Sequence, residues 1–228
     1  FGPFVNNHFH KISKFFLRII FLKKSNYQRI FVPKNLKSII KSTKVQNFVK
    51  KKILYYDSNQ NYIFNTANYL SHIDIRTSNS AYRNSVKEFK KFFKLQNIKK
   101  NNKYKYILIS RSGARKLLNE DMLFKALEPL GFKKISFEKY SITKQVEISK
   151  NAKIMIGYHG AGMANSFFMN KKNYLIEILN KHYNHPVFMQ SAKIYKLKYK
   201  KFICKKNFLN LDGICDVGSI LKYIKKIQ

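Results

Sequence analysis

The segment 153–169 has residue types and spacing that suit phosphate binding. An apolar run breaks at Gly157, His159, Gly160 and Gly162 follow, and the next residues have the composition of a buried helix. This pattern predicts a strand, a tight turn and a helix start. Glycine lets the backbone approach a ligand closely, and the amides at a helix start favour phosphate. The segment therefore predicts a site for a phosphorylated small molecule.

Two arginines follow another apolar run, at residues 106–110. Arg111 can offer a planar fork of donors to phosphate oxygens, and Arg115 can act as a second cation behind it. The alternatives are an ordinary surface arginine or an ion pair with Glu120. In a parallel sheet, ligands bind beyond the carboxyl ends of the strands, so we expect loops 110–115 and 157–162 to converge on one crevice.

Strands and helices alternate from residue 105 onward, which predicts an α/β fold with a parallel sheet covered on both faces. Asn119 is expected to cap a helix before the acidic Glu120, and Gly131 lies just beyond the end of that helix. The expected strands are residues 106–110, 134–138, 153–156 and 174–179, and the expected helices are 120–130, 144–150 and 161–168.

The pattern before residue 100 is less regular. It predicts helices at residues 12–22 and 35–42, and strands at 29–32, 53–56 and 62–65. A polar stretch, 99–103, is typical of a linker. We therefore expect two domains, 1–98 and 103–228, in which the last helix, 217–228, could cross back over the first.

The net charge of +35 comes almost entirely from lysine. Lys, Asn, Ile, Phe and Tyr are abundant together, as an AT-rich genome would impose, and the lysines are spread along the chain, which favours solvated faces. Cys204 and Cys215 are too few for a zinc site, so we expect them to pack in a reducing compartment. The longest apolar stretch, 15–22, is too short to span a bilayer, so the chain is expected to be soluble. Because it begins at Phe1 without a methionine, we also expect it to be a fragment.

Several motifs in order resemble the catalytic domain of glycosyltransferase family 61. They are ISRSGARKLLNEDML at 109–123, GF at 131–132, Gln145 with Val146, GYHGAGMANSFFM at 157–169 and YLIEIL at 174–179. The likeness covers residues 104–203 well and 1–95 loosely. His10, followed by aromatic and apolar residues, resembles the histidine of the family's N-terminal domain, although the family usually has an aromatic or aliphatic residue where Lys11 stands.

The resemblance implies a GT-B architecture with two Rossmann-like halves, of which the N-terminal, acceptor-side half is incomplete or reduced. It also implies an inverting glycosyltransferase that moves a sugar from a nucleotide-sugar, expected to be UDP-linked, to a glycan or protein hydroxyl in surface polysaccharide synthesis. The residues expected to bind the nucleotide-sugar are Arg111, Arg115, Gly160, Ala161, Gly162, Asn165 and Glu177. Glu177 would accept hydrogen bonds from ribose hydroxyls, and Asn165 would brace the phosphate loop.

The catalytic base is expected in the N-terminal half. His10 fits because an imidazole can take a proton from a hydroxyl near neutral pH, with His8 and then Asp57 as alternatives. His159 could donate to a phosphate or to the sugar, or fix the loop. Asn119 and Glu120 could orient Arg111 or the glycine turn, or serve helix stability alone. No metal or other cofactor is expected, since the turn amides and arginines supply the countercharge and no Asp-x-Asp motif occurs.

Other functions stay open. A lipase-type hydrolase would need a Gly-x-Ser-x-Gly elbow, which the sequence lacks. A nucleic-acid-binding module would use the lysines and aromatic rings, but neither is arranged for it, so no specific nucleic acid is expected. A homologue that binds the donor without catalysis is a third reading. Bacterial relatives imply a cytoplasmic protein whose lysines could meet anionic lipid at the inner membrane face, whereas eukaryotic relatives work in the ER or Golgi lumen.

Overall fold

The computed structural model describes residues 29–43, 47, 50, 52–57, 60, 91–92, 101–183 and 185–228. The chain divides into two compact units, an N-terminal one formed by residues 1–97 with 141–143 and a C-terminal one formed by 98–140 with 144–228. Each unit is described by itself. Among the helices of the described ranges, none combines the length and apolarity that a membrane span requires.

The described part of the N-terminal unit is a β-α-β arrangement. Strand β1 (Arg29–Pro33) leads through η4 (Lys34–Leu36) into helix α3 (Lys37–Thr43), and β2 (Lys52–Tyr56) pairs with β1 in parallel. Alternate apolar side chains on the strands and helix form its core, namely Ile30, Val32, Leu36, Ile40 and Ile53. The expected strands at 29–32 and 53–56 are confirmed. The expected elements at 12–22 and 62–65 lie outside the described residues.

The C-terminal unit holds a five-stranded parallel sheet. Its strands are β3 (Tyr106–Ile109), β4 (Phe132–Ile135), β5 (Ile154–Tyr158), β6 (Tyr174–Leu179) and β7 (Lys198–Ile203), in the order β4-β3-β5-β6-β7. The helical elements are η6 (Asn102–Tyr104), α6 (Glu120–Leu127), η7 (Glu128–Leu130), η8 (Phe137–Lys139), α7 (Ile142–Asn151), η9 (Ala161–Phe168), α8 (Val187–Tyr195) and α9 (Val217–Ile227). The expected α/β class is confirmed.

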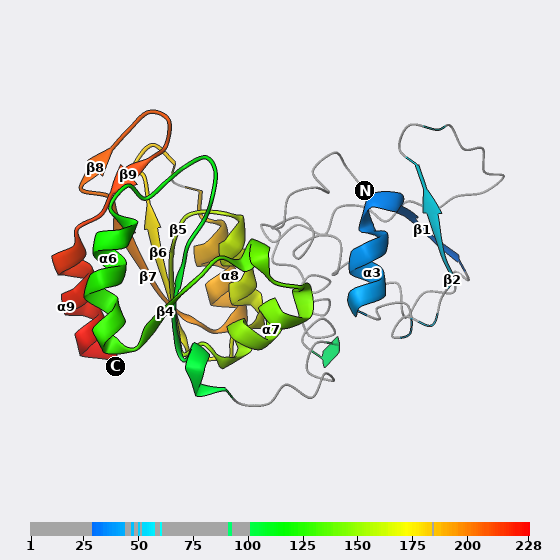
Figure 1. Cartoon of the computed structure of the whole chain (residues 1–228), viewed down its shortest axis with the longest axis horizontal. Coiled ribbons are helices and arrows are strands. Elements are labelled where there is room, and N and C mark those ends of the chain that lie inside the picture. The colour runs from blue at the N-terminus through cyan, green and yellow to red at the C-terminus, as the bar shows by residue number, and fades with distance from the viewer. Residues whose placement is uncertain are drawn as a thin grey trace. The chain divides into compact units, whose positions relative to one another are not determined.

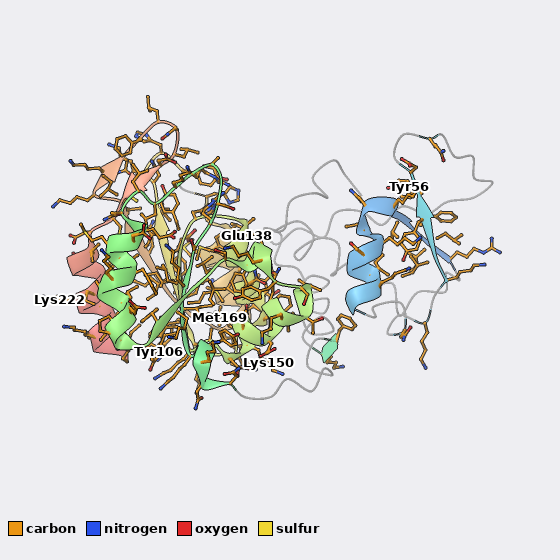
Figure 2. The ribbon with its side chains drawn as sticks, viewed as in Figure 1. Tyr56, Tyr106, Glu138, Lys150, Met169 and Lys222 are labelled. Carbon is orange, nitrogen blue, oxygen red and sulfur yellow. The ribbon has the colours of Figure 1, made fainter. Side chains whose placement is uncertain are left out.

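Helices cover both faces of this sheet. Figure 1 shows α6 and α9 on one side of the strands and α7 and α8 on the other. Because side chains alternate along a strand, one face carries Ile154, Ile156 and Tyr158 against α6 and α9. The residues between them in the sequence point to the opposite face, as Gly157 does on β5 and Glu177 does on β6. Side chains fill the space between the layers, whereas Lys222 on α9 extends outward (Figure 2).

Several boundaries differ from the expected ones. Strand β4 begins at Phe132, two residues before the expected 134, because Gly131 turns the chain with a φ of 83° and Phe132 is fully buried opposite Tyr106. Strand β5 does not break at Gly157 but continues through Tyr158, held by its parallel neighbours. The expected helix at 161–168 has the right bounds but is a 3₁₀ helix.

A small antiparallel hairpin, β8 (Lys206–Asn207) with β9 (Gly213–Ile214), follows the sheet. Its loop, residues 208–212, is held at the carboxyl edge by three contacts. Tyr158 donates its hydroxyl to the Leu211 carbonyl at 2.7 Å, and Asn180 donates to the carbonyls of Phe208 and Asp212 at 2.9 and 2.7 Å. The last strands and loops of the chain thus shape the edge where the strands end.

Lysine is distributed unevenly over the sheet. The central strands β3, β5 and β6 contain no lysine, whereas the edge strands hold Lys133 and Lys134 on β4 and Lys198, Lys200 and Lys201 on β7. The central strands are buried on both faces, where an unpaired ammonium would be costly. The lysine bias of the composition is therefore confined to places where water reaches the side chain.

Cys204 and Cys215 lie in the core between the sheet and α9, each 4% exposed, which confirms them as packing residues. Burial raises the pKa of each thiol to about 11, from an ordinary value of 9.0. Folding therefore favours the protonated thiol, and this contribution to stability is complete below about pH 9 and is lost as the pH rises through about 11.

We therefore expect the free energy of unfolding, measured by urea denaturation, to fall between about pH 9 and pH 11. Cys204→Ala and Cys215→Ala should each flatten this fall, since each removes one titrating thiol. Met122→Ala, which changes a methionine that is 63% exposed, should keep the wild-type slope. Equal slopes in the cysteine variants and the wild type would show that the thiols do not contribute.

Candidate functional site

The strand order creates a switch point beside β3. The chain passes from β3 to β4 on one side and then returns to place β5 on the other side of β3. The loops that leave β3 and β5 therefore start side by side at the carboxyl edge and then run in opposite directions. The crevice between two such loops is where ligands bind in open α/β sheets. The loops at this point are residues 110–116 and 159–162, so the topology brings the two predicted loops to the same place.

Arg111 joins these two loops directly. Its Nη1 donates a hydrogen bond of 3.0 Å to the His159 carbonyl. The guanidinium lies so close to Gly160 that an ideal Cβ on that residue would be 2.3 Å from Nη1. A side chain at position 160 would therefore have to displace the Arg111 guanidinium. The expected proximity of Arg111 to the glycine turn is present in the structure.

Two cations, Arg111 and Arg115, lie at this edge. Burial and the charge of Arg115 lower the pKa of the Arg111 guanidinium, while Glu138, Tyr158 and Asp212 oppose the change. Within the described ranges neither arginine forms an ion pair with a carboxylate. Since like charges in a half-buried position repel each other, an anion bound here would relieve that repulsion.

The nearby acids are engaged elsewhere. Glu138 accepts a hydrogen bond of 3.1 Å from the Ser112 hydroxyl. Asp212 accepts one of 2.6 Å from the Lys116 amide and a second of 3.0 Å from Asn210. These carboxylates thus organise the backbone of the loops and leave the two guanidinium groups for another anion.

The glycine turn leads into η9. Gly160 is buried beneath Arg111, and Ala161 and Gly162 are half-buried. The first hydrogen bond of the turn runs from the Met163 amide to the Gly160 carbonyl at 3.0 Å. The backbone N–H groups of Ala161 and Gly162 therefore come before the hydrogen bonds of the helix. Asn165 is fully buried and donates to the Gly162 carbonyl at 3.0 Å, which is the bracing contact expected of it.

His159 is held from inside the protein. Its Nδ1 is hydrogen-bonded to Glu177 Oε1, and the Tyr199 hydroxyl donates to Glu177 Oε2. Glu177 is 1% exposed and His159 is 6% exposed. Both oxygens of Glu177 thus have protein partners, His159 on one and Tyr199 on the other, and its predicted contact with ribose hydroxyls stays a prediction.

Aromatic rings complete the surroundings of His159. Its ring centroid lies 4.8 Å from that of Tyr183 and 5.1 Å from that of Phe188. The Arg115 guanidinium lies over the Tyr183 ring, 5.0 Å from its centroid. Arg115 has a φ of 62°, a conformation that a side chain other than glycine rarely adopts. Tyr183 thus connects Arg115 with His159.

Sequence reasoning missed Tyr183 and Tyr199. Tyr183 follows β6 by four residues, and the placement of a polar aromatic residue just beyond a predicted strand was a signal that could have found it. Tyr199 belongs to a lysine-rich strand without an apolar run, so no periodic pattern marked it.

Asn119 and Glu120 have other partners than expected. Asn119 occupies the N-cap position of α6, but its side chain makes no capping bond. It pairs instead with the backbone of Cys215, accepting from the amide and donating to the carbonyl, each at 3.0 Å. Glu120 accepts from the Ser110 hydroxyl at 2.6 Å and pairs with Lys134 at 2.9 Å. Glu120 therefore anchors the start of the loop that carries Arg111, and does not pair with that arginine.

The base candidates belong to the N-terminal unit. His10 and His8 lie outside the described residues. Asp57 follows β2 and, with Pro33, Lys34 and Asn35, lines a hollow of about 330 Å³ at the carboxyl ends of β1 and β2. In the part of the chain that the structure describes, no group of three or more His, Cys, Asp or Glu side chains could hold a metal ion.

Comparison with known proteins identifies glycosyltransferases as relatives of this chain. The chain is 34% identical over 76 residues to the EGF domain-specific O-linked N-acetylglucosamine transferase of Drosophila melanogaster, a match that covers 32% of this chain and 15% of that protein. It is 32% identical over 81 residues to the xylan glycosyltransferase MUCI21 of Arabidopsis thaliana, covering 33% of this chain and 16% of that protein. The chain thus matches about a sixth of the length of each relative.

The sequence profile of the family described as glycosyltransferase 61 matches residues 8–176. This range is most of the chain, and it contains Arg111, the glycine turn, three of the five strands of the C-terminal sheet and the first half of β6. The chain belongs to glycosyltransferase family 61.

Proposed function

We propose that the carboxyl edge of the C-terminal sheet binds the diphosphate of a nucleotide-sugar, and that the protein transfers the sugar to a hydroxyl group. One observation carries this proposal: Arg111 and Arg115 are half-buried, have no carboxylate ion pair among the described residues, and adjoin the glycine turn at the switch point. A pyrophosphate supplies the negative charge that this arrangement lacks.

The chemistry follows from the departing group. A nucleoside diphosphate leaves with added negative charge, which fixed donors stabilise more strongly in the transition state than in the ground state. Arg111 spends one of its five N–H donors on the His159 carbonyl, which fixes its position, and keeps others for phosphate oxygens. The amides of Ala161 and Gly162 add donors at the start of η9.

The acceptor is assigned to the N-terminal unit in a GT-B arrangement of two Rossmann-like halves, with transfer that inverts the sugar carbon. His10 remains the proposed base, and Asp57, beside its hollow, is the alternative. One relative is named as an O-linked N-acetylglucosamine transferase specific for EGF domains, and the other as a xylan glycosyltransferase, which supports a glycan or protein acceptor. A UDP-linked sugar is the donor we propose. Synthesis of a surface polysaccharide is the setting we propose.

Titration with nucleoside diphosphates tests the donor site. UDP should produce chemical-shift changes in the Gly160 and Gly162 amides of the labelled full chain. Release of UDP from a UDP-sugar when candidate glycan acceptors are added would then separate an active transferase from a homologue that only binds the donor. If no nucleoside diphosphate shifts those amides, the proposed site is wrong.

Replacing Arg111 by alanine removes a charged donor from the phosphate site. We expect Arg111→Ala to weaken UDP binding by about 1.5–3 kcal/mol, the usual size of a charge-assisted hydrogen bond, as measured by calorimetry. Arg29→Ala is the matched control, because Arg29 is an exposed arginine at the start of β1. Equal affinities for Arg111→Ala and the wild type would remove Arg111 from the site.

A methyl group at position 160 should displace the Arg111 guanidinium, because the new Cβ would lie 2.3 Å from Nη1. We therefore expect Gly160→Ala to weaken UDP binding by about as much as Arg111→Ala. Gly218→Ala is the control: its Cβ would meet only an Asp216 oxygen at 3.5 Å, and alanine favours the helix by about 0.5–1 kcal/mol. A Gly160→Ala protein that binds UDP normally would contradict the close-approach argument.

A further inference from the structure

We propose that Glu177 and Tyr199 hold the His159 imidazole in a single tautomer, with hydrogen on Nδ1, so that Nε2 is the ring nitrogen offered to the bound donor. The contact between Nε2 and the donor rests on the proposed function. The tautomer set by Glu177 and Tyr199 does not. Glu177 and Tyr199 are positioning residues in this scheme, since they act through His159.

The hydrogen-bond inventory sets the tautomer. An ionised carboxylate can only accept hydrogen bonds, so the His159 nitrogen that meets Glu177 Oε1 must carry a hydrogen. That nitrogen is Nδ1. Within the described part of the chain, Nε2 has no hydrogen-bond partner. In the neutral ring Nε2 therefore holds the lone pair, and in the protonated ring it gains an N–H that can donate to a phosphate oxygen.

Two hydrogen-bond partners satisfy the Glu177 carboxylate in the core. A carboxylate that is 1% exposed would be costly without partners. Here each oxygen accepts one hydrogen bond, Oε1 from His159 and Oε2 from Tyr199. Burial and the charge of Glu177 raise the pKa of the Tyr199 phenol, so the hydroxyl stays protonated and remains a donor.

The sheet register explains how the three groups meet. Glu177 lies opposite Gly157 on β5, and His159 is two residues beyond Gly157, hence on the same face. Ile109 on the neighbouring strand β3 fills the position of a Gly157 side chain, since an ideal Cβ there would lie 2.9 Å from the Ile109 Cβ. On the other side Tyr199 lies opposite Leu175, two residues before Glu177, so its long side chain reaches Glu177 diagonally.

The ring is also fixed by packing. Tyr183 and Phe188 lie against it with interplanar angles of 64° and 60°, so the imidazole cannot turn over without moving both rings. The charged groups that surround it are Glu177 by direct contact, Arg111 on its carbonyl oxygen and Arg115 across Tyr183. Glu177 thus lies behind the ring, and Arg111 and Arg115 lie beside the proposed phosphate position. This arrangement suits a histidine that supports anion binding through Nε2.

The test is nitrogen NMR of the full chain labelled at histidine, at about pH 8.5, well above the ordinary pKa of a histidine. The His159 signals are identified by their loss in His159→Gln. We expect hydrogen on Nδ1 in the ligand-free wild type. Tyr199→Phe should broaden or shift the Nδ1 signal, and Glu177→Leu should move the hydrogen toward Nε2. Tyr174→Phe, which removes a hydroxyl that accepts an exposed hydrogen bond from Lys198, should change neither.

The same variants are then titrated with UDP. We expect Tyr199→Phe to weaken binding by about 2- to 10-fold, as for loss of one hydrogen bond, with Tyr174→Phe unchanged. Hydrogen on Nε2 in the wild type, or a tautomer unaffected in both Tyr199→Phe and Glu177→Leu, would overturn the inference. Failure of the wild type to bind UDP while the Nδ1 tautomer is present would overturn the proposed function and leave the positioning role intact.

Discussion

The hydrogen bond from Arg111 to the His159 carbonyl is the constraint on which the site depends. It joins the loop after β3 to the loop after β5, the two loops that diverge at the switch point of the sheet. Because it directs the guanidinium onto Gly160, a cation and a set of helix-start amides share one location. Glu120 supports this arrangement through Ser110, where the first loop leaves its strand. The proposed diphosphate site thus depends on the topology and on one fixed side chain, more than on any single motif.

A buried carboxylate on the inner strand β6 is the second requirement. Glu177 stands in an otherwise apolar strand, and its cost is offset by donors from β5 and β7 on either side. The family match ends at residue 176, so both Glu177 and Tyr199 lie beyond it. The part of the chain that matches the family therefore carries Arg111 and the glycine turn, and the following strands supply the residues that hold His159.

Local patterns predicted the elements whose signals are local. The apolar runs at β3, β5 and β6 gave three central strands, and the order of motifs placed Arg111 and the glycine turn at the same edge. Features that depend on register or on distant partners were not predictable. Tyr199 contacts Glu177 because of the register in which β7 pairs with β6. The side-chain amide of Asn119 is hydrogen-bonded to Cys215, 96 residues away, and not to the start of its own helix. The 3₁₀ form of η9 also escaped prediction, since its apolar composition suits either kind of helix.

The lysines of the edge strands β4 and β7 bear on the self-association of this protein. An open sheet ends in strands whose backbone N–H and C=O groups can recruit a strand from another chain, a common origin of aggregation. Lys133 on one border, and Lys198, Lys200 and Lys201 on the other, place like charges where such a neighbour would have to dock, whereas Lys134 is paired with Glu120 and Asp121. Mutual repulsion between identical borders then opposes stacking into fibrils. A compositional bias that looks like genomic drift thereby protects the exposed flanks of the sheet.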